Sequence, residues 1–325
     1  MSYRRALLPL ALAATGSALL TACGTSAGGG DSKHADGRPQ VVASFYPMRY
    51  LAEQIGGDRV HVTDLTAAGT EPHDLELTAK QVATVQRADA VLYLKGLQPT
   101  VDRAVAQSHS AHVLDAAALS PLVERGAGAE DGEDGEADQH EHEGDHEHGH
   151  DHAADPHLWL DPARYATVAQ GVGAELAKAD PANADTYRRN ADDLTARLAT
   201  LDQEYREGLH GCTQRSFVTS HAAFGYLADR YQLRQIAING IDPESEPTPA
   251  RMARIQQTAK AQGATTVFFE ATAGPRLAQS VAKDLDLRTS VLDPLEGVRN
   301  GSGADYFSVM RQNLANLRPA LGCAR

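Results

Sequence analysis

Four short motifs, far apart in the chain, carry the residue types that bind divalent metal ions. They are Thr70-Glu-Pro-His-Asp-Leu-Glu76, Asp155-Pro-His-Leu-Trp-Leu-Asp161, Thr219-Ser-His-Ala222 and Leu292-Asp-Pro294. Three imidazoles and one carboxylate make the four-coordinate tetrahedral set that suits a borderline-soft ion such as zinc. We therefore predict a metal site formed by His73, His157, His221 and Asp293.

Strand and helix signals alternate around these motifs. Short runs rich in β-branched and aromatic residues lie at 41–45, 60–65, 90–94, 216–219, 264–269 and 287–292,. This order predicts an α/β fold built from βα units. We expect His73 in the loop after the second run, and His221 on a helix that follows 216–219.

Ligands of open α/β sheets collect beyond the carboxyl ends of the strands. His221, Glu270 and Asp293 each follow a predicted strand in the sequence. Glu71, close to His73, is a reserve ligand, and Glu270 is either a reserve ligand or a carboxylate that orients a ligating imidazole.

Two helices between the motifs have clear start signals. Asp161-Pro162 supplies an N-cap and a first-turn proline, and apolar residues then recur on one face through Leu176,. Asp180-Pro181 opens a second amphipathic run through Leu209, which at about 1.5 Å per residue would span roughly 40 Å,. We predict a helix over 181–210 that joins two α/β lobes, 41–180 and 211–325.

The segment 127–154 combines glycine, acidic residues and closely spaced histidines. Its histidines are His140, His142, His146, His148, His150 and His152. Such a composition forms no core, and we expect a disordered loop that captures metal weakly rather than a plain solvated spacer. The formal charge of the chain is −13. Eleven acidic residues lie in 130–152 alone, and this stretch has no Lys or Arg. Acidity is therefore a property of this loop, and no basic patch supports binding of nucleic acid.

The N-terminus has the pattern of an export signal. Arg4 and Arg5 precede an apolar run, 6–20, that is too short to span a bilayer,. Small residues then lead to Cys23, as in a bacterial lipobox, where the cysteine is lipidated after cleavage; the alternative is an ordinary secretory signal. We expect a signal peptide over 1–22, lipidation of Cys23 and a flexible tether over 23–40.

The chain has three cysteines, and the lipobox interpretation uses the first of them. The remaining pair, Cys212 and Cys323, belongs to an exported protein, where oxidation is the norm. We predict a disulfide between them that fastens a C-terminal helix to the second lobe.

The motifs resemble those of the zinc- and manganese-specific solute-binding lipoproteins of bacterial ABC importers, the cluster A-I family. The resemblance covers nearly all of the chain after the tether. It rests on Glu71-Pro-His73, Asp155-Pro-His-Leu-Trp-Leu-Asp161, Thr219-Ser-His-Ala-Ala-Phe-Gly-Tyr226, Val267-Phe-Phe-Glu270, Asp293-Pro-Leu-Glu-Gly297 and the acidic His-rich loop. It implies two lobes bridged by a rigid helix, with the ion in the cleft between them. His73 and His157 would come from the first lobe, and His221 and Asp293 from the second.

The resemblance also implies a function and partners. The protein would bind Zn²⁺ outside the cytoplasm, anchored to the outer face of the membrane lipid through acylated Cys23, and pass the ion to an ABC permease as a monomer. A third imidazole at His221 favours zinc, because harder, oxygen-richer sites suit manganese. The fourth ligand stays open between Asp293, Glu71 and water.

Three other functions remain as alternatives. A manganese-binding member of the same family would bind a different ion at the same place, and a surface adhesin would need no transport partner. A zinc hydrolase would need an open coordination position and a general base, and the sequence has no His-Glu-x-x-His helix,. We therefore expect a binding protein rather than an enzyme.

Overall fold

The computed structural model describes residues 37–126, 152–244, 247–270, 276–298 and 303–324. The predicted signal peptide, Cys23 and most of the tether lie outside these ranges, as do His140, His142, His146, His148 and His150. None of the helices in the described ranges combines the length and the apolar character needed to cross a membrane.

The first half of the chain forms a parallel sheet of four strands in the order β2-β1-β3-β4. The strands are β1 (Gln40–Ala43), β2 (His61–Asp64), β3 (Ala90–Tyr93) and β4 (Val113–Asp115). The helices between them are α1 (Tyr46–Gly56), α2 (Ala79–Arg87), α3 (Pro99–Ala106) and α4 (Ala116–Leu119), with a 3-10 turn at Gly57–Arg59. Because successive side chains alternate between the faces, Val41 packs on the α1 side while Val42 packs against α2 and α3,.

A second parallel sheet repeats this pattern in the order β10-β9-β7-β8. Its strands are β7 (Ser216–Thr219), β8 (Arg234–Ala237), β9 (Thr266–Phe269) and β10 (Arg288–Val291). The accompanying helices are α7 (Gly225–Arg230), α8 (Pro249–Ala261), α9 (Arg276–Leu285) and α10 (Tyr306–Ala320). Residues of α8 and α9 form a separate apolar cluster on one face of this sheet.

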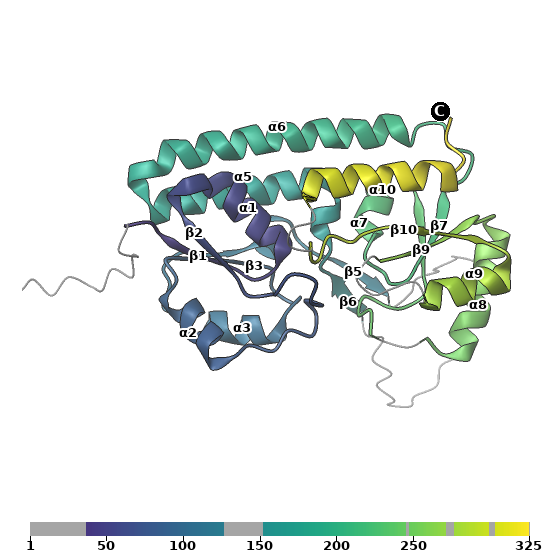
Figure 1. Cartoon of the computed structure of the whole chain (residues 1–325), viewed down its shortest axis with the longest axis horizontal. Helices are drawn as coiled ribbons and strands as arrows, with labels where there is room; N and C mark the ends of the chain where they lie inside the picture. The colour runs from purple at the N-terminus through teal and green to yellow at the C-terminus, as the bar shows by residue number, and fades with distance from the viewer. Residues whose placement is uncertain (1–36, 127–151, 245–246, 271–275, 299–302, 325) are drawn as a thin grey trace, which may run out of the picture. The chain divides into compact units, whose positions relative to one another are not determined.

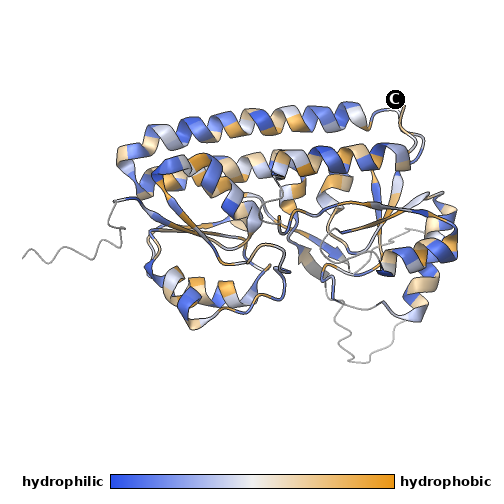
Figure 2. Ribbon diagram, in the orientation of Figure 1, coloured by the Kyte–Doolittle hydropathy of each residue, from blue (hydrophilic) through white to orange (hydrophobic). Residues whose placement is uncertain are grey.

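Two long helices connect the sheets. After a 3-10 turn at Leu158–Leu160, α5 (Pro162–Ala179) begins at Asp161, whose side chain accepts hydrogen bonds from the backbone N–H groups of Ala163 and Arg164. A second 3-10 turn, Pro181–Asn183, leads into α6 (Ala184–Gly208), the longest helix in the described ranges (Figure 1). Hydrophilic and hydrophobic residues alternate along α6 (Figure 2), and its buried face packs on α1, α5 and α10.

One apolar cluster runs through both halves of the chain. It contains residues of α1, α5, α6, α7 and α10 together with strand residues of both sheets. The residues predicted as apolar faces of the two connecting helices are buried, namely Tyr165, Val168, Ala169, Val172 and Leu176 in α5, and Tyr187, Ala191, Leu194, Leu198, Leu201 and Tyr205 in α6, followed by Leu209. A shared core therefore holds the two sheets and the helices between them together.

A short antiparallel hairpin lies between the first sheet and α5. Strand β5 (Val123–Gly126) pairs with β6 (His152–Asp155), so that Gly126 is opposite His152. The two ends of the histidine-rich segment 127–151 therefore meet at one place. The hairpin is also tied to the second half, because the backbone N–H of Val123 donates to the hydroxyl of Tyr226 at 2.9 Å.

The predicted disulfide between Cys212 and Cys323 is present. It joins Cys212, four positions after the end of α6, to Cys323, three positions after the end of α10. Next to it, the backbone N–H of Gln214 donates to the carbonyl of Leu321 at 2.9 Å. The bridge therefore fastens the C-terminal end of the chain to the start of the second sheet.

The predicted fold class, α/β with two parallel sheets linked by a long helix, is confirmed. The exact division into lobes at 180 and 210 stays a prediction. Two local predictions differ from the structure: the long helix starts at Ala184 after a 3-10 turn, and His221 lies in a loop rather than on a helix, since α7 starts at Gly225. The backbone N–H of Ala222 donates to the carbonyl of Gly240 instead of to a helical partner.

Candidate metal centre

Four side chains converge at one place, and three of them are histidines predicted from the sequence. The group is His73, His157, His221 and Glu296, whose potential ligand atoms all lie within 4.8 Å of one another. His157 and His221 are fully buried, and the side chain of His73 is 11% exposed. His73 and His157 come from the first half of the chain and the other two from the second half.

The distances suit one small ion. Oε1 of Glu296 lies 3.5 Å from Nε2 of His73, 3.4 Å from Nε2 of His221 and 2.8 Å from Nε2 of His157. A tetrahedral zinc ion with bonds of about 2.0 to 2.1 Å holds its ligand atoms roughly 3.3 to 3.4 Å apart. Two of the three separations already match this spacing, and the third is a hydrogen bond that an ion would replace.

Carboxylates behind two of the imidazoles fix their orientation. Nδ1 of His157 lies 2.8 Å from Oδ1 of Asp155, and Nδ1 of His221 lies 2.5 Å from Oε1 of Glu270. A carboxylate at Nδ1 holds the proton there and leaves Nε2 free to bind a metal. Nε2 of His73 and Nε2 of His221 are buried without a hydrogen-bond partner in the part of the chain that the structure describes. Such atoms need a partner, and a cation would supply it.

The histidines and the carboxylates shift one another's protonation. Burial opposes ionisation of Glu296, but the hydrogen bond from His157 and the close approach of the imidazoles of His221 and His73 outweigh it and hold the pKa of Glu296 well below its ordinary value. Burial likewise disfavours the charged form of His157, yet its bonds to Asp155 and Glu296 raise its pKa. Glu296 therefore stays ionised among the imidazoles, and a metal ion that binds there must displace protons from them.

Asp293 is not among the four converging side chains. Its Oδ1 accepts a hydrogen bond from the backbone N–H of Leu295 at 2.8 Å, which closes a tight turn,. Asn313 of α10 bonds both the N–H and the carbonyl of Asp293. Leu295 adopts a left-handed conformation with φ of 60°. Asp293 thus shapes the turn that directs Glu296 into the site, and the structure groups Glu296, not the predicted Asp293, with the three histidines.

The turn carrying Glu296 is fastened to the first half of the chain by Trp159. The indole Nε1 of this fully buried residue donates to the carbonyl of Pro294 at 2.7 Å. Its ring lies 5.2 Å from the ring of His157 and 4.9 Å from that of Phe45, measured between centroids. One side chain therefore contacts a histidine of the group and positions the segment that supplies the carboxylate.

The two reserve carboxylates support histidines without joining the group. Oε1 of Glu71 accepts from the backbone N–H of His73 at 3.1 Å. Burial, with the negative charge of Glu296 nearby, raises the pKa of Glu71 to about 7. Glu270 accepts from Ser220 and contacts Nδ1 of His221 through the same oxygen. The predicted role of Glu270 as a carboxylate that orients an imidazole agrees with this geometry.

Glu296 could have been selected from the sequence. An Asp followed by Pro commonly begins a turn in which the Asp carboxylate bonds the backbone two residues later. In Asp293-Pro-Leu-Glu-Gly297 this leaves Glu296 as the carboxylate without a local partner. Gly297 follows directly, and a Cβ there would lie 3.4 Å from the backbone nitrogen of Gly69, so the Glu296 turn packs closely on the loop that carries His73.

Zinc binding is expected to weaken as pH falls, because protons compete for the imidazoles. His221 is buried, which disfavours its charged form, but Glu270 outweighs this and raises its pKa well above the ordinary value of about 6.5,. A raised pKa means that the metal-free site keeps its proton to higher pH, so zinc displaces that proton even at neutral pH. Calorimetric titrations in buffers of different ionisation enthalpy measure the protons released, and zero release at pH 7 would contradict the expectation.

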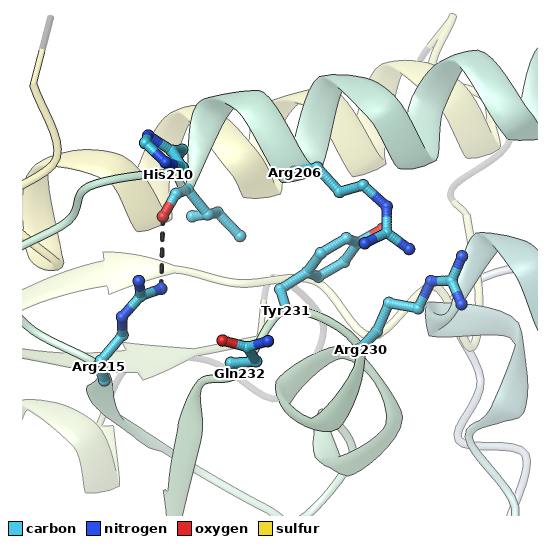
Figure 3. A pocket seen from close by; sticks show the side chains of 7 residues that line it. Arg206, His210, Arg215, Arg230, Tyr231 and Gln232 are labelled. Carbon is cyan, nitrogen blue, oxygen red and sulfur yellow. Dashed lines mark hydrogen bonds between the residues drawn. The ribbon is translucent and has the colours of Figure 1, made fainter.

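A pocket away from the four converging side chains is lined by basic rather than acidic residues. A pocket of about 230 Å³ lies where α6 ends, lined by Arg206, Leu209, His210, Arg215, Arg230, Tyr231 and Gln232 (Figure 3). Asp202 pairs with Arg206 and Arg230, and Arg215 donates to the carbonyl of Leu209 at 3.4 Å. This basic pocket contains no carboxylate among its lining residues and is unsuited to a cation.

The predicted loop ligands other than His152, which begins β6, lie outside the described residues.

Comparisons with known proteins agree with the geometry. A family profile described as zinc-uptake complex component A, periplasmic (ZnuA), matches residues 41–320. The chain is 38% identical over 289 residues to the zinc-binding protein AdcA of Streptococcus pyogenes serotype M6, covering 87% of this chain and 56% of that protein. The chain thus spans about half the length of the first such relatives. It is also 34% identical over 310 residues to the high-affinity zinc uptake system protein ZnuA of Bacillus subtilis, covering 93% of this chain and 94% of that protein.

Solved structures give the same relationship. Zn(II)-bound AdcA of Streptococcus pneumoniae superposes with a TM-score of 0.71 at 33% identity, covering 88% of this chain and 58% of that one. The laminin-binding protein Lmb of Streptococcus agalactiae, described as a bifunctional protein with adhesin and metal transporting activity, gives 0.73 at 29% identity, covering 87% and 99%. Since the profile matches most of the chain and the Bacillus relative matches it over nearly its whole length, the chain belongs to the family of the periplasmic zinc-uptake component A.

Proposed function

We propose that this protein is the extracytoplasmic zinc-binding component of an ABC importer. The observation that carries the proposal is the convergence of His73, His157, His221 and Glu296 from both halves of the chain. Ligands drawn from two halves of the chain let one ion hold both halves in a single arrangement. A partner that recognises this arrangement can distinguish the loaded protein from the empty one.

The donor set favours zinc over manganese. Three imidazole nitrogens and one carboxylate oxygen match the preferences of zinc, whereas manganese prefers a larger share of oxygen ligands. Four protein ligands also leave no position for a metal-bound water, which a hydrolase would need. The manganese and hydrolase alternatives are therefore not favoured, and we infer a binding protein rather than an enzyme. The zinc-binding and zinc-uptake names of the relatives do not favour the adhesin alternative.

Membership of the family supports further proposals about partners. We infer that a membrane permease accepts the ion, that acylated Cys23 anchors the protein in membrane lipid, and that the protein acts as a monomer. The high-affinity zinc uptake function in the name of the Bacillus subtilis relative, which matches this chain over 93% of its length, supports the permease as partner.

The direct test is a competitive metal titration of the purified protein that follows the signal peptide. Zinc, manganese, cobalt and copper are each titrated against a chromophoric chelator. One tight zinc site, with much weaker binding of manganese, is the expected result. A site that prefers manganese, or hydrolysis of ester and peptide substrates by the zinc-loaded protein, would overturn the proposal.

Glu296 and Asp293 are expected to respond differently to amide substitution. Glu296→Gln removes the negative charge from the proposed fourth ligand and should weaken zinc binding by about 10- to 100-fold or more, the scale of losses near a metal. Asp293→Asn preserves an oxygen that accepts from Leu295 and should have a smaller effect. Competition titrations of the two variants measure this, and a larger loss in Asp293→Asn would restore Asp293 as the ligand.

The histidine-rich segment is proposed to hold further zinc weakly. Replacing 128–150 with a short turn, which leaves β5 and β6 in place, should lower the total zinc bound and spare the tight phase. Protons compete with zinc for imidazole nitrogens, so the extra zinc should dissociate as pH falls toward about 5.5, below the value of about 6.5 for a free histidine. Equilibrium dialysis gives the stoichiometry. Loss of the tight phase with the segment would place it within the main site.

A further inference from the structure

Arg125 is outside the group of four converging side chains but contacts the residue that orients one of them. Its Nε donates to Oδ2 of Asp155 at 2.8 Å. Oδ1 of the same carboxylate accepts from the backbone N–H of His157 at 3.0 Å and lies 2.8 Å from its Nδ1. Asp155 is fully buried. One buried carboxylate therefore joins the guanidinium of the hairpin to the imidazole of the site.

The second half of the chain holds Arg125 in this position. Its Nη2 donates to Oδ2 of Asp229 at 2.7 Å, and its Cζ lies 5.0 Å from the ring centroid of Tyr226. The hydroxyl of Tyr226 donates in turn to the carbonyl of Asp155 at 2.8 Å. Both contacts come from α7, so the position of the guanidinium depends on the packing of the two halves.

We propose that Arg125 is a positioning residue for the metal site, acting through Asp155 on His157; this rests on the proposed function. Arg125 holds the Asp155 carboxylate through Oδ2, and this fixes Oδ1 against Nδ1–H of His157. This fixes the tautomer in which the unprotonated Nε2 faces the ion, and it raises the basicity of the imidazole.

Gly225, the first residue of α7, shows how closely the pair is packed. A Cβ at this position would lie 2.6 Å from Nε of Arg125 and 2.8 Å from Oδ2 of Asp155. Gly225→Ala therefore keeps both charges but must displace one of them. Alanine is otherwise the better helix former, so α7 itself gains from the change. This variant disturbs the Arg125 to Asp155 contact without removing either group.

Arg164 provides a matched control. Its Cζ lies 4.7 Å from the ring centroid of the same Tyr226, and its Nη1 donates to Ser120 and Pro121. Arg164 lies nine positions after Asp155 in the sequence, but its guanidinium donates to Ser120 and Pro121 and not to Asp155. Arg164→Gln thus removes a positive charge and a cation–π contact from the same neighbourhood while leaving the Arg125 to Asp155 bond.

The test compares zinc affinity in four variants of the full chain by competition with a chelator. Arg125→Gln and Gly225→Ala should weaken zinc binding by about 10- to 100-fold, as losses behind a ligating histidine do. Arg164→Gln should bind zinc as the wild type does. Arg125→Lys, which keeps the charge and loses the planar fork, should fall between Arg125→Gln and the wild type.

A second readout separates positioning from general stability. The Nδ1–H resonance of His157 in the zinc-loaded protein should shift in Arg125→Gln and Gly225→Ala and stay unchanged in Arg164→Gln. Wild-type affinity in both test variants overturns the inference, and so does a loss of affinity with an unchanged His157 resonance. If Arg125→Gln does not fold, Gly225→Ala decides by the same criteria. Wild-type affinity in His157→Ala would instead defeat the proposed ligand set.

Discussion

Replacing His157 by alanine is expected to weaken zinc binding by at least about 10- to 100-fold, the scale on which even losses behind a ligand are felt. His157 is fully buried, and its two ring nitrogens contact Glu296 and Asp155. The substitution removes one of three nitrogen donors and leaves two buried carboxylates without their imidazole. His73→Ala and His221→Ala should act in the same direction, since each removes one donor. Competition titration against a chelator of known affinity measures the change.

His210→Ala is the control for this experiment. His210 is exposed, lines the basic pocket and lies outside the group of four, so its loss should leave zinc affinity unchanged. Melting curves of each variant without metal separate a lost ligand from a damaged fold. Zinc affinity equal to the wild type in all three site variants would refute the ligand assignment.

Removing the disulfide is expected to lower the free energy of unfolding by about 2 to 5 kcal/mol. The bridge joins cysteines separated by 111 positions, and closing so long a loop removes much of the entropy of the unfolded chain,. The Cys212→Ser, Cys323→Ser double variant should therefore unfold at lower denaturant concentration than the oxidised protein. Denaturant titrations of the oxidised protein, the reduced protein and the double variant test this.

Reductant supplies the matching control. The wild type should lose stability in reductant, whereas the double variant should be insensitive to it. Backbone bonds beside the bridge, such as that from Gln214 to Leu321, remain in both proteins. Equal stability of the oxidised and reduced wild type would mean that these contacts alone fix the C-terminal end.

The sequence predicted much of this fold because the apolar spacing is regular. Leu194, Leu198 and Leu201 recur at three and four positions, and all are buried on one face of α6. Local signals failed where a distant backbone group intervened. The segment after β7 was expected to be helical, but the N–H of Ala222 finds its acceptor in Gly240, and the helix begins only at Gly225.

The sequence likewise predicted part of the candidate site, namely its three histidines. The three histidines sit in recognisable motifs, and the structure brings them together. The fourth member depends on the turn at Asp293 and the left-handed backbone of Leu295, which together decide which of two nearby carboxylates faces inward. Contacts such as Arg125 with Asp155 and Asp229 join segments that are far apart in sequence, and no local pattern encodes them.

Because β5 and β6 pair with each other, the fold can tolerate histidine-rich segments of different lengths between them. Gly126 and His152 are paired by the strands themselves, so the segment between them starts and ends at a fixed point. Doubling the length of a flexible loop costs only about 0.6 kcal/mol of closure entropy. A segment of another length and composition, with more or fewer histidines, could therefore replace this one while Asp155 and His157 keep their places.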